Sequence, residues 1–304
     1  MNITNPKGLW PVMLTPFTNS GEVDYPSLER LIHWYEENQA DGLFAVCQSS
    51  EMFFLSLKER LKIAEFVKSH ASIPVIASGH TAYSLEDQAA ELQAMAQTGV
   101  DAVVLITNRM DGPGQDAGAW KENLMYLLDA ADPTVPLGLY ECPHPYKRLL
   151  SNEEIRFAAE TGRFLFLKDT CCDIQVIEAR LKAIENTKLQ LFNANSSTLL
   201  PSLRRGAAGF SGVMANFHPA LYAKLLGCWE TSPEQAEKIQ AFLSLCSLME
   251  RQFYPVNAKY HLQTQGIFSS IYTRSVNHTG LSPLFQQEVQ YMDLLAKDFY
   301  GSLK

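Results

Sequence analysis

Short apolar runs alternate with longer amphipathic stretches from the N-terminus to about residue 215. The apolar runs are aliphatic and aromatic without strict alternation, which is typical of strands that are buried on both faces of a parallel sheet. The eight predicted strands span residues 9–14, 42–46, 74–77, 102–106, 136–140, 164–168, 189–192 and 209–213.

The amphipathic stretches between these strands predict helices. Ser56, Ser84 and Ser151 each stand three residues before an acidic side chain, a spacing typical of a helix start with a capping box or a charged first turn. The predicted helices span residues 27–38, 57–69, 85–97, 117–130, 152–160, 174–184 and 198–205. Repeated βα units with eight strands favour a closed (β/α)₈ TIM barrel.

After residue 216 the pattern changes to successive helical stretches, at 219–229, 233–253 and 286–299. We therefore expect a barrel over residues 1–216 and a helical extension over 217–304 that packs on it, with an independent small helical domain as the alternative. A doubly wound nucleotide-binding sheet would require a G-x-G-x-x-G loop after its first strand, and the sequence has none there.

Composition limits the classes of partner. The formal net charge is −8, and no lysine-rich or arginine-rich tract gives the basic footprint of a nucleic-acid binder. No run approaches the roughly 18 apolar residues of a membrane helix, and the N-terminus lacks the apolar core of a signal peptide. We expect a cytoplasmic globular protein with a small-molecule partner and no contact with nucleic acid or membrane.

The cysteines predict neither disulfides nor a metal site. None of the six shows the paired C-x₂-C spacing, and a bridge between two adjacent cysteines would be strained. We expect free thiols at Cys47, Cys142, Cys171, Cys172, Cys228 and Cys246.

The sixth predicted strand carries the sharpest chemical signal. It ends in Lys168, and burial at the end of an apolar strand favours the neutral amine and lowers the pKa of a lysine. A neutral amine can attack a ketone and form a Schiff base, which an arginine cannot do. The alternative is an ordinary ion pair at the strand end, with Asp169 or Glu141.

Two other strand ends supply candidate groups. Tyr140 ends the fifth strand, where its phenol can exchange protons with a substrate held on Lys168 or, alternatively, only cap the barrel core. The loop Cys47-Gln48-Ser49-Ser50-Glu51 follows the second strand. Its hydroxyl and backbone N–H groups suit a carboxylate, although a serine-rich turn that caps a helix has the same composition.

These segments resemble the dihydrodipicolinate synthase and N-acetylneuraminate lyase superfamily over roughly residues 7–220. Their order and spacing match the family, and the set is specific although each segment alone is weak. The matching segments are residues 8–17 (GLWPVMLTPF), 55–60 (LSLKER), 140–143 (YECP), 167–170 (LKDT) and 209–216 (GFSGVMAN).

The resemblance implies a mechanism and an assembly. It implies that Lys168 forms an imine with pyruvate or a longer 2-oxo acid and that Tyr140 relays protons. It also implies that Gln48 and Ser49 bind the carboxylate and that Ser211 borders the imine. No cofactor or metal is expected, because the iminium itself withdraws electrons. Members of the family are commonly homotetramers, so a homo-oligomer is expected.

The sequence departs from the family pattern at three places around the expected substrate site. The family's Gly-Thr-Thr-Gly-Glu is replaced by residues 47–51, which lack both glycines and one hydroxyl. Met110 stands where the synthases have a relay tyrosine, and Pro145 stands where they have an arginine for the aldehyde substrate's carboxylate. These differences argue against a role in lysine biosynthesis.

Other side chains must then contact the distal part of the substrate. Arg109 is a candidate for a distal carboxylate or hydroxyl-rich end, with an exposed loop arginine as the alternative, and His80 is a candidate acid or base that otherwise only lines the pocket. The remaining candidates are Glu141, His144 and Asn195.

The sequence thus predicts a Schiff-base lyase, an aldolase or a dehydratase, that acts on a 2-oxo acid. The contrasting hypothesis is a barrel that binds a small acid without catalysis, as a sensor. The altered segment 47–51 and the missing tyrosine motivate this second hypothesis.

Overall fold

A computed structural model describes residues 3–111 and 117–303, and it confirms the TIM barrel. Eight parallel strands form one sheet in the order β1-β8-β7-β6-β5-β4-β3-β2. The parallel bridge between Val12 and Phe44 joins the segment after β1 to β2 and closes the ring. The strands are β1 (Gly8–Leu9), β2 (Leu43–Phe44), β3 (Val75–Ser78), β4 (Ala102–Ile106), β5 (Leu137–Tyr140), β6 (Phe164–Asp169), β7 (Gln190–Asn193) and β8 (Gly209–Phe210).

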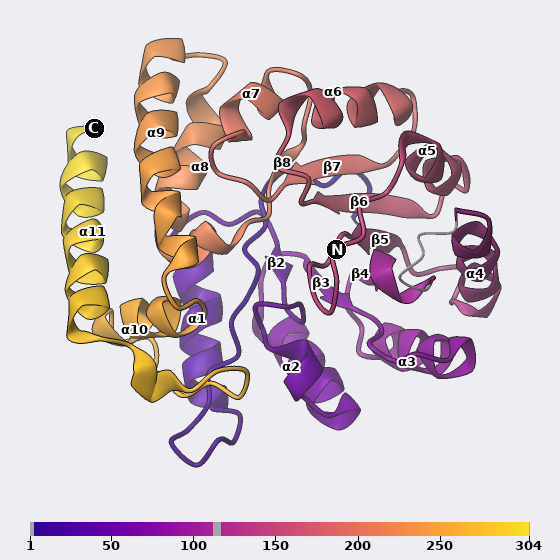
Figure 1. The fold of residues 1–304 in the computed structure, drawn as a ribbon, viewed down its shortest axis with the longest axis horizontal. Helices are drawn as coiled ribbons and strands as arrows, with labels where there is room; N and C mark the ends of the chain where they lie inside the picture. Colours follow the sequence, from indigo (N-terminus) through magenta and orange to yellow (C-terminus); the bar gives the residue numbers. More distant parts are fainter. Residues whose placement is uncertain (1–2, 112–116, 304) are drawn as a thin grey trace.

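The helices between the strands surround the barrel (Figure 1). The serine caps are confirmed: the hydroxyls of Ser56, Ser84 and Ser151 each accept a hydrogen bond from a backbone N–H of the first turn. These helices are α1 (Tyr25–Glu37), α2 (Leu57–His70), α3 (Leu85–Gln97), α4 (Ala117–Ala130), α5 (Asn152–Glu160), α6 (Ile174–Ala183), α7 (Leu199–Leu203) and α8 (Pro219–Cys228).

The first and last strands are shorter than the sequence predicts. Proline has no N–H to donate, so Pro11 interrupts the hydrogen-bond ladder of β1. After β8 the chain turns into a 3-10 helix, Val213–Asn216, in place of a longer strand. The first helix starts earlier than predicted, because the Asp24 side chain caps it and accepts a hydrogen bond from the Ser27 N–H.

The C-terminal helices pack beside the barrel on the side of α1 and α8 (Figure 1). The Phe242 and Phe299 rings stack at 4.6 Å and join α9 to α11. The stretch predicted as one helix over 233–253 ends earlier, because the chain tightens into a 3-10 helix at Ser247–Arg251. The helices are α9 (Pro233–Cys246), α10 (Val256–Thr264), which the sequence did not predict, and α11 (Pro283–Ser302). The domain boundary at residue 216 stays a prediction.

Aromatic side chains fill the inside of the barrel. Phe166 of β6 stacks on Phe192 of β7 with ring centroids 4.3 Å apart, and the Trp10 ring lies 5.6 Å from Phe166. Phe44 of β2 meets Phe166 edge to face. This apolar floor excludes water beneath the carboxyl ends of the strands, where active sites of this fold lie.

Candidate active site

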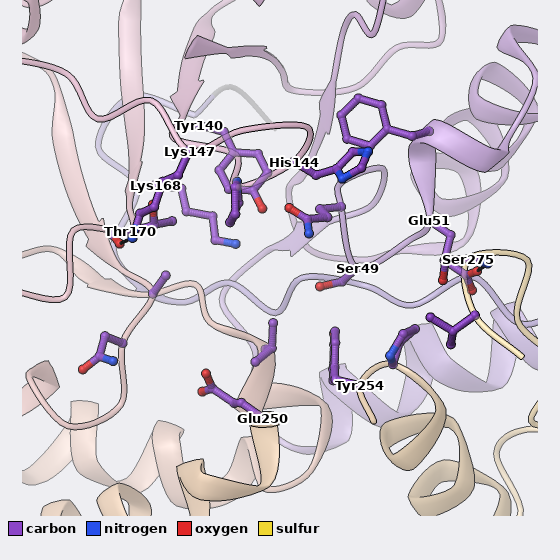
Figure 2. Close-up of a pocket in the computed structure, with 18 of the residues that line it drawn as sticks. Ser49, Glu51, Tyr140, His144, Lys147, Lys168, Thr170, Glu250, Tyr254 and Ser275 are labelled. Atoms are coloured by element: carbon purple, nitrogen blue, oxygen red, sulfur yellow. Dashed lines mark hydrogen bonds between the residues drawn. The ribbon is translucent and has the colours of Figure 1, made fainter. Parts of the chain in front are cut away.

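A cavity of about 470 Å³ opens at the carboxyl end of the barrel. The loops after β2, β5, β6 and β7 form most of its wall, and residues 250–255 and 275–276 of the C-terminal segment close the remaining side (Figure 2). Lys168, Tyr140, Gln48, Ser49 and Asn195, all predicted site residues, line it together.

Lys168 reaches the cavity because of strand alternation. Side chains two residues apart share a face of a strand, so Phe166 and Lys168 both point into the barrel. Tyr140 is the register partner of Lys168 on β5, and the Lys168 amine lies 4.3 Å from the centre of the Tyr140 ring. Lys168 is only 3% exposed, and its burial lowers its pKa.

The carboxylates next in sequence do not neutralise this amine. Glu141 and Asp169 each follow an inward-facing residue, so they point outward and bind Arg180 of α6. The Arg180–Glu141 distance is 2.6 Å, and all three side chains are buried. Among the residues that the structure describes, no carboxylate lies within ion-pair distance of Lys168, which excludes the strand-end ion pair.

Tyr140 is suited to donate a proton. Its phenol is buried beside the Cys142 thiol, and burial raises the pKa of Tyr140 well above its usual value. The Phe44 ring packs against it edge to face at 5.7 Å. A phenol held in this way stays protonated at neutral pH, so its proton is available to an oxygen that becomes more basic than the phenolate.

The loop after β2 places Gln48 and Ser49 in the wall of the cavity. The Cys142 thiol donates to Gln48 Oε1 at 3.3 Å, and Ser49 lines the cavity together with Tyr254. Glu51 adopts a left-handed backbone conformation with φ of 60°, which is uncommon for a residue other than glycine. The buried Lys259 amine binds its carboxylate at 2.6 Å and helps to hold this turn.

Four predicted site residues lie outside the lining of the cavity. Glu141 binds Arg180, as described above. His80 is fully buried, and that burial lowers its pKa to about 3, so its ring is neutral at physiological pH. Arg109 stacks between the rings of Phe53 and Tyr83. Ser211 is buried after β8, and its hydroxyl has no hydrogen-bond partner within the described residues.

The C-terminal segment supplies lining residues that sequence reasoning missed. Glu250, Tyr254 and Ser275 face the cavity (Figure 2). One signal was available: Tyr254 precedes a proline, a position that disfavours helix and marks the end of the preceding helical stretch. His144, a further candidate from the sequence, also lines the cavity.

The described residues contain neither a metal-binding cluster nor a membrane-spanning helix. In residues 3–111 and 117–303, no group of three or more His, Cys, Asp or Glu side chains is arranged to hold a metal ion. No helix in these ranges is both long and apolar enough to cross a bilayer. The six cysteines are free thiols, as expected.

Comparisons with known proteins agree with this architecture. Residues 5–279 match the model of the dihydrodipicolinate synthetase family. The 4-hydroxy-tetrahydrodipicolinate synthase of Coxiella burnetii is 27% identical over 261 residues, which cover 84% of this chain and 86% of that protein. The enzyme of the same name from Bacillus subtilis is 26% identical over 261 residues, covering 84% and 88%.

Solved structures resemble the fold over almost its full length. A dihydrodipicolinate synthase from Bacillus anthracis superimposes with a TM-score of 0.86 at 16% identity, covering 97% of this chain and 99% of that one. A prophage protein of the dihydrodipicolinic acid synthase family from Escherichia coli K12, in complex with pyruvate, gives a TM-score of 0.86 at 20% identity, covering 96% and 98%.

Proposed function

Because this chain belongs to the dihydrodipicolinate synthetase family, we propose that it is a lyase that forms a Schiff base between Lys168 and a 2-oxo acid. The observation that carries the proposal is the buried Lys168 amine beside Tyr140, without a carboxylate at ion-pair distance among the described residues. Burial lowers the pKa of Lys168 and so favours the neutral amine, which is the nucleophile.

The groups around Lys168 have separate roles in the proposed reaction. The amine adds to the ketone carbon and one of its protons passes to the former ketone oxygen, which leaves as water after it takes a second proton from the Tyr140 phenol. The remaining iminium withdraws electrons from the neighbouring carbon. Gln48 and Ser49 are proposed to bind the substrate carboxylate, because both line the cavity that holds the Lys168 amine. Ser49 lies on the side toward which this amine extends (Figure 2).

We propose a substrate other than that of the true synthases. Pro145 offers no cation at the position of the synthase arginine, and the Met110 side chain is buried and has no proton to relay. The reaction proposed for a different 2-oxo acid is an aldol cleavage, a condensation or a dehydration, since all three share the imine. By analogy with the family, we expect a cytoplasmic homo-oligomer that needs no cofactor, and light scattering would test the assembly.

Borohydride trapping tests the proposal. Pyruvate and a panel of longer 2-oxo acids are incubated with the protein, reduced, and mapped by peptide mass spectrometry. We expect an adduct on Lys168 that Lys168→Arg abolishes. Lys182→Arg is the control, since that lysine is exposed on α6 and should leave the adduct unchanged. A wild-type protein that forms no adduct with any acid of the panel, yet binds one, would be a binding protein and not a lyase.

A further inference from the structure

Glu250 brings a carboxylate into the cavity from outside the β-barrel. It lies in the 3-10 helix Ser247–Arg251, which directly follows α9. Figure 2 shows Glu250 and Tyr140 on opposite sides of the Lys168 amine. The Oε1 atom of Glu250 is shielded from solvent and has no hydrogen-bond partner among the described residues. A buried acceptor without a partner costs free energy, which is common at functional sites.

The charges around Glu250 leave it free to exchange a proton. The cations that act on it are Lys168 across the cavity and Arg251 beside it in sequence, and Lys147 lines the same cavity. The Tyr254 phenol, the Cys172 thiol and the His144 ring line the same cavity as Glu250.

Burial raises the pKa of Glu250 to about 7, and the two cations lower it in part. Both protonation states are therefore populated at neutral pH, which is the condition under which a general acid–base works best. Burial also raises the pKa of Tyr140 well above its usual value, so the phenolate, the form that could act as a base, is scarcely populated at neutral pH. The two side chains are thus matched to different proton transfers.

We propose that Glu250 is the general base that removes a proton from C3 of the 2-oxo acid bound as an iminium on Lys168, and that returns a proton to this carbon. The C3–H electron pair becomes the C2–C3 double bond of the enamine, the C2–N π pair moves to nitrogen, and the proton goes to the Glu250 carboxylate. The inference rests on the proposed function, because the iminium is what makes C3 acidic.

Deuterium exchange of pyruvate isolates this step without knowledge of the natural substrate. In D₂O each cycle of enamine formation replaces a methyl hydrogen by deuterium, which proton NMR follows as loss of the methyl signal. We expect Glu250→Gln to slow enzyme-dependent exchange by roughly 10²- to 10⁴-fold, the usual effect of removing a general base. The borohydride adduct on Lys168 should stay within a few-fold of wild type.

Two further variants make the test specific. Glu237→Gln removes a carboxylate of α9 that is exposed and pairs with Arg204, so it should exchange like wild type. Glu250→Asp keeps the acid but shortens its reach, and it should retain part of the exchange. In wild type, exchange should rise with pH through about 7 as Glu250 loses its proton, and Glu250→Gln should lack this limb. The titration of Lys168 also affects exchange, because only its neutral amine forms the iminium. Measuring the rate of adduct trapping across the same pH range gives this contribution separately from that of Glu250.

The outcomes distinguish the two proposals. If wild type forms no adduct with pyruvate or with any other 2-oxo acid, the Schiff-base function itself fails. If the adduct forms and Glu250→Gln exchanges as fast as wild type, only the role of Glu250 is overturned. If a folded Glu250→Gln protein, checked by its melting temperature, loses the adduct together with exchange, Glu250 tunes the amine and is not the base.

Discussion

Replacing Arg180 by methionine should destabilise the fold strongly. Its guanidinium binds Glu141 and Asp169 behind β5 and β6 and donates to the Leu150 carbonyl at 2.9 Å. Methionine fills similar space but leaves two carboxylates buried without a cation. One of them, Glu141, already has a raised pKa because of its burial.

The expected magnitude follows from the cost of breaking a buried ion pair. Removing one partner typically costs about 3–5 kcal/mol, because the remaining charge is buried and uncompensated. That cost corresponds to roughly two to four orders of magnitude in the unfolding equilibrium. Two carboxylates lose their partner here, so we expect a value toward the upper end of this range.

Urea unfolding followed by circular dichroism measures this difference. The midpoint should fall while the dependence on urea stays similar, which indicates a change in stability and not in the extent of unfolding. Arg205→Met is the matched control, because Arg205 pairs with Glu178 at the surface and its loss should hardly move the midpoint. A loss below about 1 kcal/mol for Arg180→Met would refute the reasoning that these buried charges depend on one cation.

Two further predictions concern the backbone and the response to pH. A Cβ at Gly209 would lie 1.9 Å from the Gly8 carbonyl oxygen, so Gly209→Ala should lower the melting temperature, at a cost of about 1–3 kcal/mol or more. The control is Gly227→Ala in α8, where nothing lies within 4 Å of the added Cβ, and it should be neutral or stabilising by about 0.5–1 kcal/mol. Equal effects of the two substitutions would contradict this prediction. The hydrogen bond from Arg274 lowers the pKa of Glu59 to about 2, so its stabilising contribution is complete above its ordinary pKa of 4.5 and is lost as pH falls toward 2. Thermal melts from pH 6 to 2 should therefore show a smaller acid-induced loss for Glu59→Gln than for wild type, and identical slopes would argue against the contact.

The barrel itself could be predicted from the sequence because its signals are local. Apolar runs of strand length and serine caps at Ser56, Ser84 and Ser151 depend on a few neighbouring residues, and the structure confirms both. Strand lengths were less accurate, because hydrogen-bond ladders depend on partners far away in sequence. At β1, for example, Pro11 has no N–H to donate and the strand ends at Leu9.

The same distinction between local signals and distant packing applies to the residues of the candidate site. Lys168 and Tyr140 end adjacent strands, so their meeting followed from the barrel. The outward direction of Glu141 was also readable, since it follows an inward-facing tyrosine by one residue. Glu250 and Tyr254 could not be assigned to the cavity, because their position depends on where α9 tightens and on how the C-terminal segment packs against the barrel mouth.

The division of the cavity wall has a consequence for how specificity can change. Lys168 and Tyr140 stand at the ends of strands near the middle of the chain, whereas the facing wall comes from residues between 250 and 276. Exchanging residues 254–276 between relatives would replace what the far end of a bound molecule meets and leave both Lys168 and Glu250 in place. Chimaeras made at this junction offer a direct route to new selectivity.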